Sequence, residues 1–198
     1  MFTSKSLRTA AFAAGAVLVA SFGAPQSAVA QDGLSWLFGG GGGGWGSSGR
    51  STVSFSRRYG RGSVIVSFSD RRLYYISRRG TAISYPIAVP RMQSRWSGTL
   101  RVTQKRVNPS WTPTPKMRRE NPRLPRYVPG GHPRNPLGTR ALYLGSTLYR
   151  IHGTDAPWTI GKAVSKGCVR MYNSDVADLY RRVPVGAKVF ITYKRFRG

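Results

Sequence analysis

The chain has 198 residues and carries 32 lysine and arginine residues against 6 aspartate and glutamate residues, a formal net charge of +26. This length suits a single domain with a sizeable core. A field of this sign draws a protein to polyanions and excludes a basic partner held by charge. Composition alone therefore establishes only that a partner is acidic.

Residues 1–30 have the features of a signal peptide. Lys5 and Arg8 precede an apolar run at 10–20, and the small residues of AVA at 28–30 suit a signal peptidase. The apolar run is short for a membrane span, which needs about 20 residues; an uncleaved anchor is the alternative. We predict cleavage after residue 30, export to a bacterial periplasm and no transmembrane span in the mature chain.

The predicted export affects which acidic molecules the basic surface could bind. The arginines come as pairs spread through the chain rather than in one helix or tail. No zinc-ligand spacing, recognition-helix pattern or aromatic RNA-binding signature accompanies them. We therefore predict no nucleic-acid partner and favour acidic wall peptides, glycans or lipid head groups.

Residues 31–61 are predicted to be a glycine-rich flexible segment. Six consecutive glycines at 39–44 would lose too much backbone entropy on ordering. The aromatic residues Trp36, Phe38 and Trp45 favour a tether that adheres to a partner. Disorder without a role is the alternative.

The remaining domain, 62–195, is predicted to be built mainly of strands. Short runs rich in β-branched and aromatic residues are bounded by turn formers such as Asp70 and Gly80. A proline-dense loop spans 109–136, and loops of this length are usually kept for function. We expect a hairpin from the first two of the following strands: 63–69, 72–77, 82–89, 98–106, 139–145, 147–153 and 187–194.

One helix is predicted near the C-terminus, where Val176, Leu179 and Val183 recur at helical spacing. Asn173 is expected to cap this helix, and Asp175 to lie near its positive end. Many strands, one clear helix and no alternation of strands with helices favour a mainly β sandwich or barrel.

Cys168 is the chain's only cysteine, and His152 lies shortly before it. In an oxidising compartment an unpaired thiol brings no disulfide and risks bridging to another chain. A thiol nucleophile needs a nearby base, and a histidine with a pKa near 6–7 suits that task. We therefore predict a reactive Cys168 with His152 as its base; a buried structural cysteine is the alternative.

The neighbours of this thiol suit acyl chemistry. Gly167 permits a sharp turn, and backbone N–H groups from Gly167 to Val169 would face a developing oxyanion. Arg170 would grip a carboxylate. The histidine also needs an orienting group, for which the Asp155 carboxylate and the Gly153 backbone carbonyl are alternatives.

The segments IHGT and SKGCVRM resemble the signature of the L,D-transpeptidases, the YkuD-type catalytic domain that remodels bacterial peptidoglycan. The likeness continues through NPSWTPTPKMR, VPGGHPRNPLGTRAL and DLYRRVPVGAKVFI and covers about residues 62–195. It implies an L,D-transpeptidase-type β fold. It also implies an enzyme that attacks the bond between the third and fourth stem-peptide residues. D-Alanine leaves, and the acyl group passes to diaminopimelate of another stem, or to an outer-membrane protein or lipoprotein.

The resemblance carries roles to four positions: the nucleophile Cys168, the general base His152, and Ser165 and Gly167 in the loop that positions the thiol. It also implies substrate binding by Gly153 and Arg170. Many members have histidine where this chain has Lys166, so the base role falls to the upstream histidine. Lys166 is expected to lie at the substrate or to help hold the thiolate.

The implied reaction is ping-pong acyl transfer, which needs no metal and no cofactor. His132, in the proline-dense loop, matches no catalytic position and is interpreted as a surface or lid residue. Two alternatives remain open at this point. One is an L,D-carboxypeptidase, in which water takes the acyl group; the other is a non-catalytic, basic wall-binding module.

Overall fold

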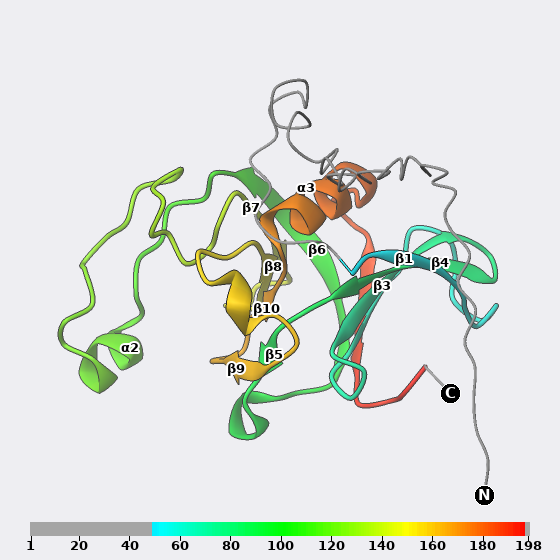
Figure 1. The fold of residues 1–198 in the computed structure, drawn as a ribbon, viewed down its shortest axis with the longest axis horizontal. Helices are drawn as coiled ribbons and strands as arrows, with labels where there is room; N and C mark the ends of the chain where they lie inside the picture. The colour runs from blue at the N-terminus through cyan, green and yellow to red at the C-terminus, as the bar shows by residue number, and fades with distance from the viewer. Residues whose placement is uncertain (1–48, 197–198) are drawn as a thin grey trace, which may run out of the picture. The chain divides into compact units, whose positions relative to one another are not determined.

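The computed structural model of the chain describes residues 49–196. These residues form a nine-stranded sheet, a two-stranded sheet and two α-helices (Figure 1). The predicted mainly β class, with one clear helix after the cysteine, is confirmed. The predicted signal peptide and residues 31–48 of the predicted flexible segment lie outside the described residues.

The large sheet has the strand order β1-β4-β3-β2-β11-β6-β7-β8-β10. Its strands are β1 Ser51–Ser54, β2 Val64–Ser67, β3 Arg72–Arg78, β4 Thr81–Pro86, β6 Gly98–Val107, β7 Arg140–Leu144, β8 Arg150–His152, β10 Val169–Arg170 and β11 Lys188–Thr192. Neighbouring strands are antiparallel except β2–β11 and β8–β10, which are parallel. The small sheet pairs β5 (Val89–Pro90) with β9 (Ala163–Ser165).

The predicted strands all appear, most of them shorter than expected. The hairpin is formed by β2 and β3, and Arg71 adopts a φ of 51° in its turn. Four strands were not predicted as separate elements: β1, β5, β9 and β10. Each has only two to four residues, too few to show a period of two in the sequence.

The predicted flexible segment does not extend to residue 61. β1 pairs antiparallel with β4 along its whole length. Phe55 and Tyr59 follow it and pack against a small second core, with the Phe55 and Tyr74 ring centroids 4.8 Å apart. The burial of these aromatic rings orders this part of the chain. The glycine-rich sequence just before it had suggested a flexible segment instead.

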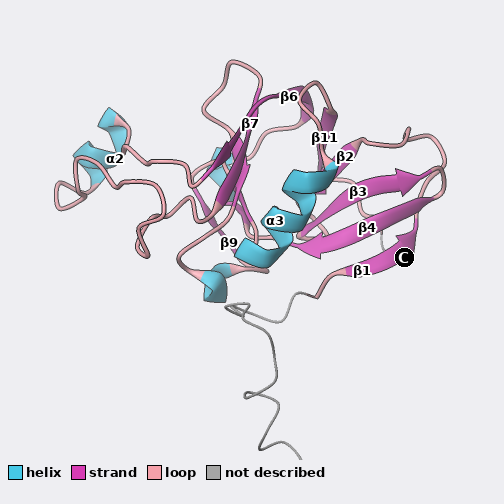
Figure 2. Ribbon diagram, turned by 90° about the horizontal axis from the view of Figure 1, so that it is seen from above, coloured by secondary structure: helices cyan, strands magenta, loops and turns pink. Residues whose placement is uncertain are grey.

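The main core lies between the two halves of the large sheet, which share β6. Figure 2 shows β1, β3 and β4 on one side of α3 and β6 and β7 on the other. A register shift between Val102 and Gln104 interrupts the β6–β7 pairing, as expected where a strand turns. The core includes Val66, Leu73 and Tyr85 from one half, Leu142, Ile151 and Val169 from the other, and Val176 and Leu179 from the helix.

The helix α3, Asn173–Arg182, occupies the predicted place, and Asp175 lies in its first turn. The predicted cap was wrong: Tyr172 is the N-cap residue, and its side chain forms no capping hydrogen bond. Asn173 is the first helical residue, and its side-chain oxygen accepts the N–H groups of Thr139 and Thr154 at 3.2 Å each. Its amide therefore joins the start of α3 to the loops beyond β6 and β8.

The proline-dense segment between β6 and β7 contains the second α-helix, α2 (Pro115–Glu120). Thr114 caps it by accepting the Met117 N–H at 3.2 Å, and proline at the first position fits a helix start. Two short 3-10 helices, η1 (Met92–Ser94) and η2 (Pro157–Thr159), complete the described elements. Within residues 49–196, no helix is long and apolar enough to cross a bilayer.

Candidate active site

The parallel pairing of β8 with β10 brings the predicted base and nucleophile onto neighbouring strands. Arg170 of β10 lies opposite His152 of β8. Cys168 directly precedes β10, and side chains alternate along strands. Cys168 and Arg170 therefore share the sheet face that carries Arg150 and His152.

His152 is 4% exposed, so its imidazole is almost fully removed from water. Its Nδ1 lies 2.6 Å from the backbone carbonyl of Gly153. Because a carbonyl only accepts, Nδ1 carries the proton and Nε2 is left as a proton acceptor. Burial, together with the positive charges of Arg170 and Arg150, lowers the imidazole pKa to about 3. His152 is therefore neutral at neutral pH, and of the two predicted orienting groups it is the Gly153 carbonyl that contacts the ring.

The Cys168 thiol is partly exposed, and its Sγ donates to the Leu148 carbonyl oxygen at 3.5 Å. Burial raises the pKa of this thiol, while the Arg150 backbone N–H and the charges of Arg150 and Arg170 act to lower it. The sulfur is therefore a protonated thiol at rest. Among the described residues it forms no hydrogen bond with the imidazole, its hydrogen-bond acceptor being Leu148 instead.

The turn before the thiol depends on Gly167. Its φ of 138° is left-handed, and a Cβ added there would lie 2.8 Å from Cε1 of Tyr149. Tyr149 cannot easily yield, because it stacks on Trp96 with ring centroids 4.6 Å apart. The buried Ser165 hydroxyl donates to the Cys168 carbonyl and lies 3.5 Å from the Gly167 N. Ser165 and Gly167 thus shape the loop that presents the cysteine.

Gly153, predicted to bind substrate, has a close neighbour in Asn173. A Cβ on Gly153 would lie 2.1 Å from the Asn173 side-chain oxygen. The Asn173 amide also donates to the Thr154 carbonyl at 3.0 Å. Asn173 therefore fixes the segment whose carbonyl contacts His152, a role that the interpretation as a helix cap missed.

Two guanidinium groups flank the thiol and the imidazole. Burial lowers the pKa of Arg170, whereas the nearby Asp155 carboxylate opposes that shift. Arg150 lies over the Tyr143 ring, 5.0 Å from its centroid, and its Nε is buried without a hydrogen-bond partner in the described part of the chain. Arg150 was not predicted, although its place two residues before His152 on a strand puts both side chains on one face.

Lys166 does not lie between these guanidinium groups. It is exposed and forms an ion pair with Glu120 at the end of α2. The charges that act on the thiol are instead those of Arg150 and Arg170. Val169 turns its side chain into the main core, where it is 2% exposed.

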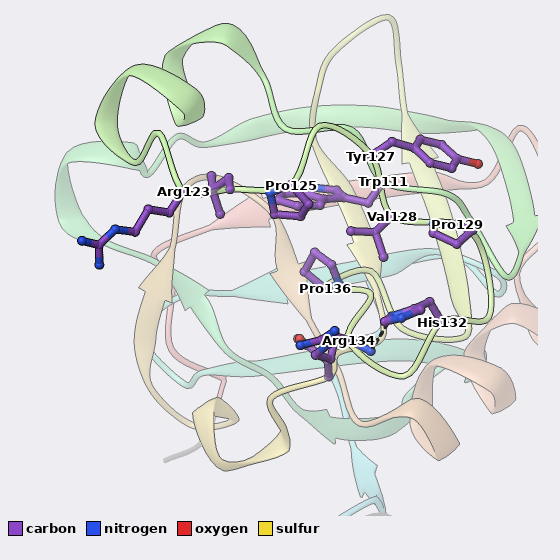
Figure 3. Close-up of a pocket in the computed structure, with 11 residues that line it drawn as sticks. Trp111, Arg123, Pro125, Tyr127, Val128, Pro129, His132, Arg134 and Pro136 are labelled. Atoms are coloured by element: carbon purple, nitrogen blue, oxygen red, sulfur yellow. Dashed lines mark hydrogen bonds between the residues drawn. The ribbon is translucent and has the colours of Figure 1, made fainter.

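Two surface cavities border this region, and neither is lined by Cys168 or His152. The larger has a volume of about 570 Å³ and is shown in Figure 3. The smaller has a volume of about 310 Å³ and includes Asn173 in its wall. His132 and Asp155 line both cavities.

The fold is that of a known class of catalytic domain, and the cysteine, histidine and arginine residues described above are its candidate active site in this chain. Residues 61–191 match the YkuD family model, described as the L,D-transpeptidase catalytic domain. The chain therefore belongs to this family, and the resemblance predicted from its motifs is confirmed.

Curated relatives agree with this membership, and one solved structure agrees with the fold. The chain is 41% identical over 133 residues to the probable L,D-transpeptidase YbiS of Escherichia coli K12, covering 64% of this chain and 43% of that protein. It is 40% identical over 140 residues to the probable L,D-transpeptidase ErfK/SrfK of the same strain, covering 66% and 44%. The chain thus spans less than half the length of these relatives.

The catalytic domain of an E. faecium L,D-transpeptidase, solved acylated by ertapenem, shares the fold with a TM-score of 0.50. That match is 17% identical and covers 66% of this chain and 95% of the other.

Proposed function

We propose that this chain is a peptidoglycan L,D-transpeptidase that uses Cys168 as nucleophile and His152 as general base. The observation that carries the proposal is the β8–β10 pairing. The thiol directly precedes β10, the neutral, buried imidazole lies on the neighbouring β8, and the same two guanidinium groups act on both. Family membership supplies the reaction class.

The first half-reaction forms a thioester. Rotation about the Cα–Cβ bond of Cys168 takes the thiol from the Leu148 carbonyl toward Nε2 of His152, which accepts the proton. The sulfur attacks the amide carbonyl carbon between the third and fourth stem residues, and the carbonyl oxygen becomes an oxyanion. Backbone N–H groups at Gly167 to Val169 donate to it. The imidazolium then protonates the leaving nitrogen, the C–N bond breaks and D-alanine departs.

The low pKa of His152 shapes this step. An imidazolium is costly in this buried site, so a stable thiolate–imidazolium pair is not formed before substrate binds. Proton transfer must therefore accompany sulfur attack. Arg150 and Arg170 favour the negative charge that develops on the sulfur and then on the substrate oxygen.

The second half-reaction transfers the acyl group. An amine nitrogen attacks the thioester carbonyl, the C–N bond forms and the C–S bond breaks. His152 takes the proton that the nitrogen loses and returns it to the departing sulfur. Cys168 is thereby restored as a thiol, and no net proton or electron is consumed.

We also propose a role for each of the three segments of the chain. Residues 1–30 act as a signal peptide, 31 onward as a glycine-rich segment, and 62–195 as the catalytic domain in a periplasm. The positive charge holds the enzyme on the acidic wall network, an attraction that weakens as salt rises. The acyl acceptor is a second stem peptide or an outer-membrane protein or lipoprotein.

Purified muropeptide tetrapeptides test the proposal. The full chain is incubated with them, and the products are separated and identified by mass spectrometry. Dimers linked between two third residues, with release of D-alanine, support transfer. Tripeptides alone show an L,D-carboxypeptidase, and unchanged substrate with the wild type leaves a wall-binding module. The Cys168→Ser variant serves as the control and should yield no product.

A further inference from the structure

One half of the large sheet carries apolar side chains on both of its faces. Along β2, Val64 and Val66 belong to the main core, which α3 also enters, whereas Ile65 between them belongs to the second core. β3 alternates in the same way, with Leu73 in the main core and Tyr74 in the second. The second core therefore lies on the face of the sheet that is turned away from α3.

This outer face is covered thinly. Among the described residues, its apolar cluster includes none from α2 or α3. Its buried members are covered by side chains that stay partly exposed, namely Val53, Phe55, Tyr59, Phe190 and Phe196. The rings pack on one another, and the Phe55 centroid lies 4.8 Å from those of Tyr74 and Phe196. We call these partly exposed side chains the aromatic face.

Five exposed arginines gather at one end of the aromatic face. They follow β1 or lie at the turn from β3 to β4: Arg57, Arg58, Arg61, Arg78 and Arg79. The Phe55 N–H donates to the Gly80 carbonyl at 2.9 Å, which joins the two segments. Nε of Arg79 also donates to the Arg57 carbonyl at 3.3 Å. Arg58 lies over the Tyr59 ring, 4.6 Å from its centroid, so the arginines adjoin the aromatic face.

No carboxylate in the part of the chain that the structure describes compensates these charges, because none of the five arginines forms an ion pair there. Asp70 contacts the second core, but it accepts the Tyr74 hydroxyl at 3.0 Å and the Phe196 N–H at 2.9 Å. It also precedes β3, whereas Arg78 ends that strand, and a strand of seven residues is roughly 20 Å long. The arginine end therefore carries uncompensated positive charge.

We propose that the five arginines and the aromatic face bind the anionic phospholipid head groups of a bilayer and hold the domain at a membrane surface. A guanidinium group fits two phosphate oxygens at once. Clustered basic residues are attracted to an anionic leaflet, and aromatic side chains favour the boundary between bilayer and water. The catalytic strands β8 and β10 lie at the other edge of the sheet, so this surface is additional to the proposed active site.

The packing of the rings disfavours single-stranded nucleic acid as the ligand. Bases stack on free ring faces, whereas Phe55 lies against its aromatic neighbours and Arg58 lies over Tyr59. An acidic wall polymer would be attracted by the charge but would gain nothing from the aromatic rings. A bilayer contacts both parts of the surface.

Sedimentation with vesicles tests the proposal. The chain from residue 31 is used, because the apolar run at 10–20 would itself enter a bilayer; residues 49–196 contain both cores. Vesicles contain equal parts of phosphatidylglycerol and phosphatidylcholine. The variant Arg57→Gln/Arg61→Gln/Arg78→Gln removes three charges and keeps the two arginines that contact Tyr59 and a backbone carbonyl. We expect this variant to bind at least about tenfold more weakly than wild type.

The matched control removes three charges from the exposed proline-dense segment, in the variant Arg118→Gln/Arg119→Gln/Arg123→Gln. It should lose at most about threefold, since long-range attraction alone is reduced. Equal losses in the two variants would overturn the proposal, because binding would then follow total charge. A wild type that does not bind these vesicles would also overturn it. The same holds if the surface variant loses binding to purified sacculi or single-stranded DNA as steeply as binding to vesicles.

Vesicle binding needs no catalysis, so the test stands even if the proposed function fails. Circular dichroism shows whether the surface variant is folded, and its ertapenem acylation should match wild type. Should that variant not fold, hydrogen exchange of the wild type replaces it. Anionic vesicles should then protect the backbone N–H groups of 55–62 and 78–81 more than those of 115–126. Protection confined to 115–126, or no protection, would overturn the proposal.

Discussion

The Asp178 cluster and the Cys168–His152 site both bring guanidinium groups to a buried polar side chain, Asp178 in the first and His152 in the second, but with different pairing. Arg182 binds the Asp178 carboxylate through two hydrogen bonds of 2.9 and 3.0 Å, and the Tyr85 hydroxyl donates to it at 2.7 Å. Arg50 and Arg181 add ion pairs at 3.3 Å. Within residues 49–196, Arg150 and Arg170 form no ion pair with any carboxylate.

This difference distinguishes charges that stabilise the fold from charges that we propose act in the reaction. Burial acts to raise the pKa of Asp178, but hydrogen bonds from Arg182 and Tyr85 outweigh it and hold the pKa below its ordinary value. The one carboxylate charge in that cluster is already compensated. At the cysteine, two cations face a neutral thiol and a neutral imidazole, so in the proposed reaction the compensating negative charge appears only as the sulfur attacks.

The largest effect is expected from the reacting pair. Cys168→Ser and His152→Gln should each lower acyl transfer by more than about 10³-fold, because they remove the nucleophile or its proton acceptor. Cys168→Ser should leave the thermal midpoint almost unchanged, since the two side chains have similar size. Initial rates with a tetrapeptide donor and circular dichroism check both statements. Near-normal transfer by either variant contradicts the assigned roles.

The opposite pattern is expected at the structural cluster. Asp178→Ala leaves Arg182 and Tyr85 without their acceptor and should lower the free energy of unfolding by about 3–5 kcal/mol. The folded fraction should still be acylated by ertapenem at the wild-type rate. Urea titration and intact-mass kinetics measure the two properties. Arg181→Ala is the matched control and should cost much less, because that side chain is 71% exposed.

The buried imidazole should make stability depend on pH. The unfolded histidine has its ordinary pKa of 6.5 and the folded one a pKa of about 3, so the unfolded chain binds the proton more readily. Folded stability is therefore complete above 6.5 and falls by about 1.4 kcal/mol per pH unit below it, until the folded pKa is reached. Urea midpoints of wild type and His152→Gln should diverge in this window. Parallel curves would show that the imidazole is solvated.

A smaller effect is expected from Arg150. Arg150→Met keeps most of the side-chain volume but removes a cation that lowers the pKa of the thiol. The pH profile of iodoacetamide alkylation at Cys168 should shift to higher pH, with a several-fold lower rate near pH 8. Arg106→Met on β6 is the control, because Arg106 also lies over Tyr143 but is exposed. An unshifted profile for Arg150→Met would show that this cation does not act on the sulfur.

The smallest effect is expected from the ion pair between Lys166 and Glu120. Both side chains are more than 40% exposed, and exposed pairs contribute little. Glu120→Gln should leave the thermal midpoint unchanged and acylation within about twofold of wild type. A large loss of acylation would show that α2 positions the loop before the cysteine.

Long segments with a clear period were predictable from the sequence. The strands of the central hairpin, β6 and α3 fall where β-branched runs or helical spacing placed them, because burial of one face imposes the pattern. β10 was not predictable, since two residues carry no period and the strand exists only through pairing with β8. β1 was hidden for a similar reason, because its stability comes from β4 and from aromatic residues distant in sequence.

The candidate site shows the same division. The residue types of Cys168 and His152 already indicated the chemistry that we propose for them. Two other contacts depend on tertiary structure that no local sequence pattern encodes. The Leu148 carbonyl accepts a hydrogen bond from the thiol, and the Asn173 side chain lies against Gly153. Arg150 lies between these cases: strand alternation could have placed it beside His152, but nothing local singled it out among 32 basic residues.

Intact-mass spectrometry after incubation with ertapenem tests the central claim most directly. The account predicts a single covalent adduct on the wild type, mapped by peptide digestion to Cys168. It predicts no adduct on Cys168→Ser and a much slower one on His152→Gln. A wild type that stays unmodified, or an adduct that persists in Cys168→Ser, would contradict it.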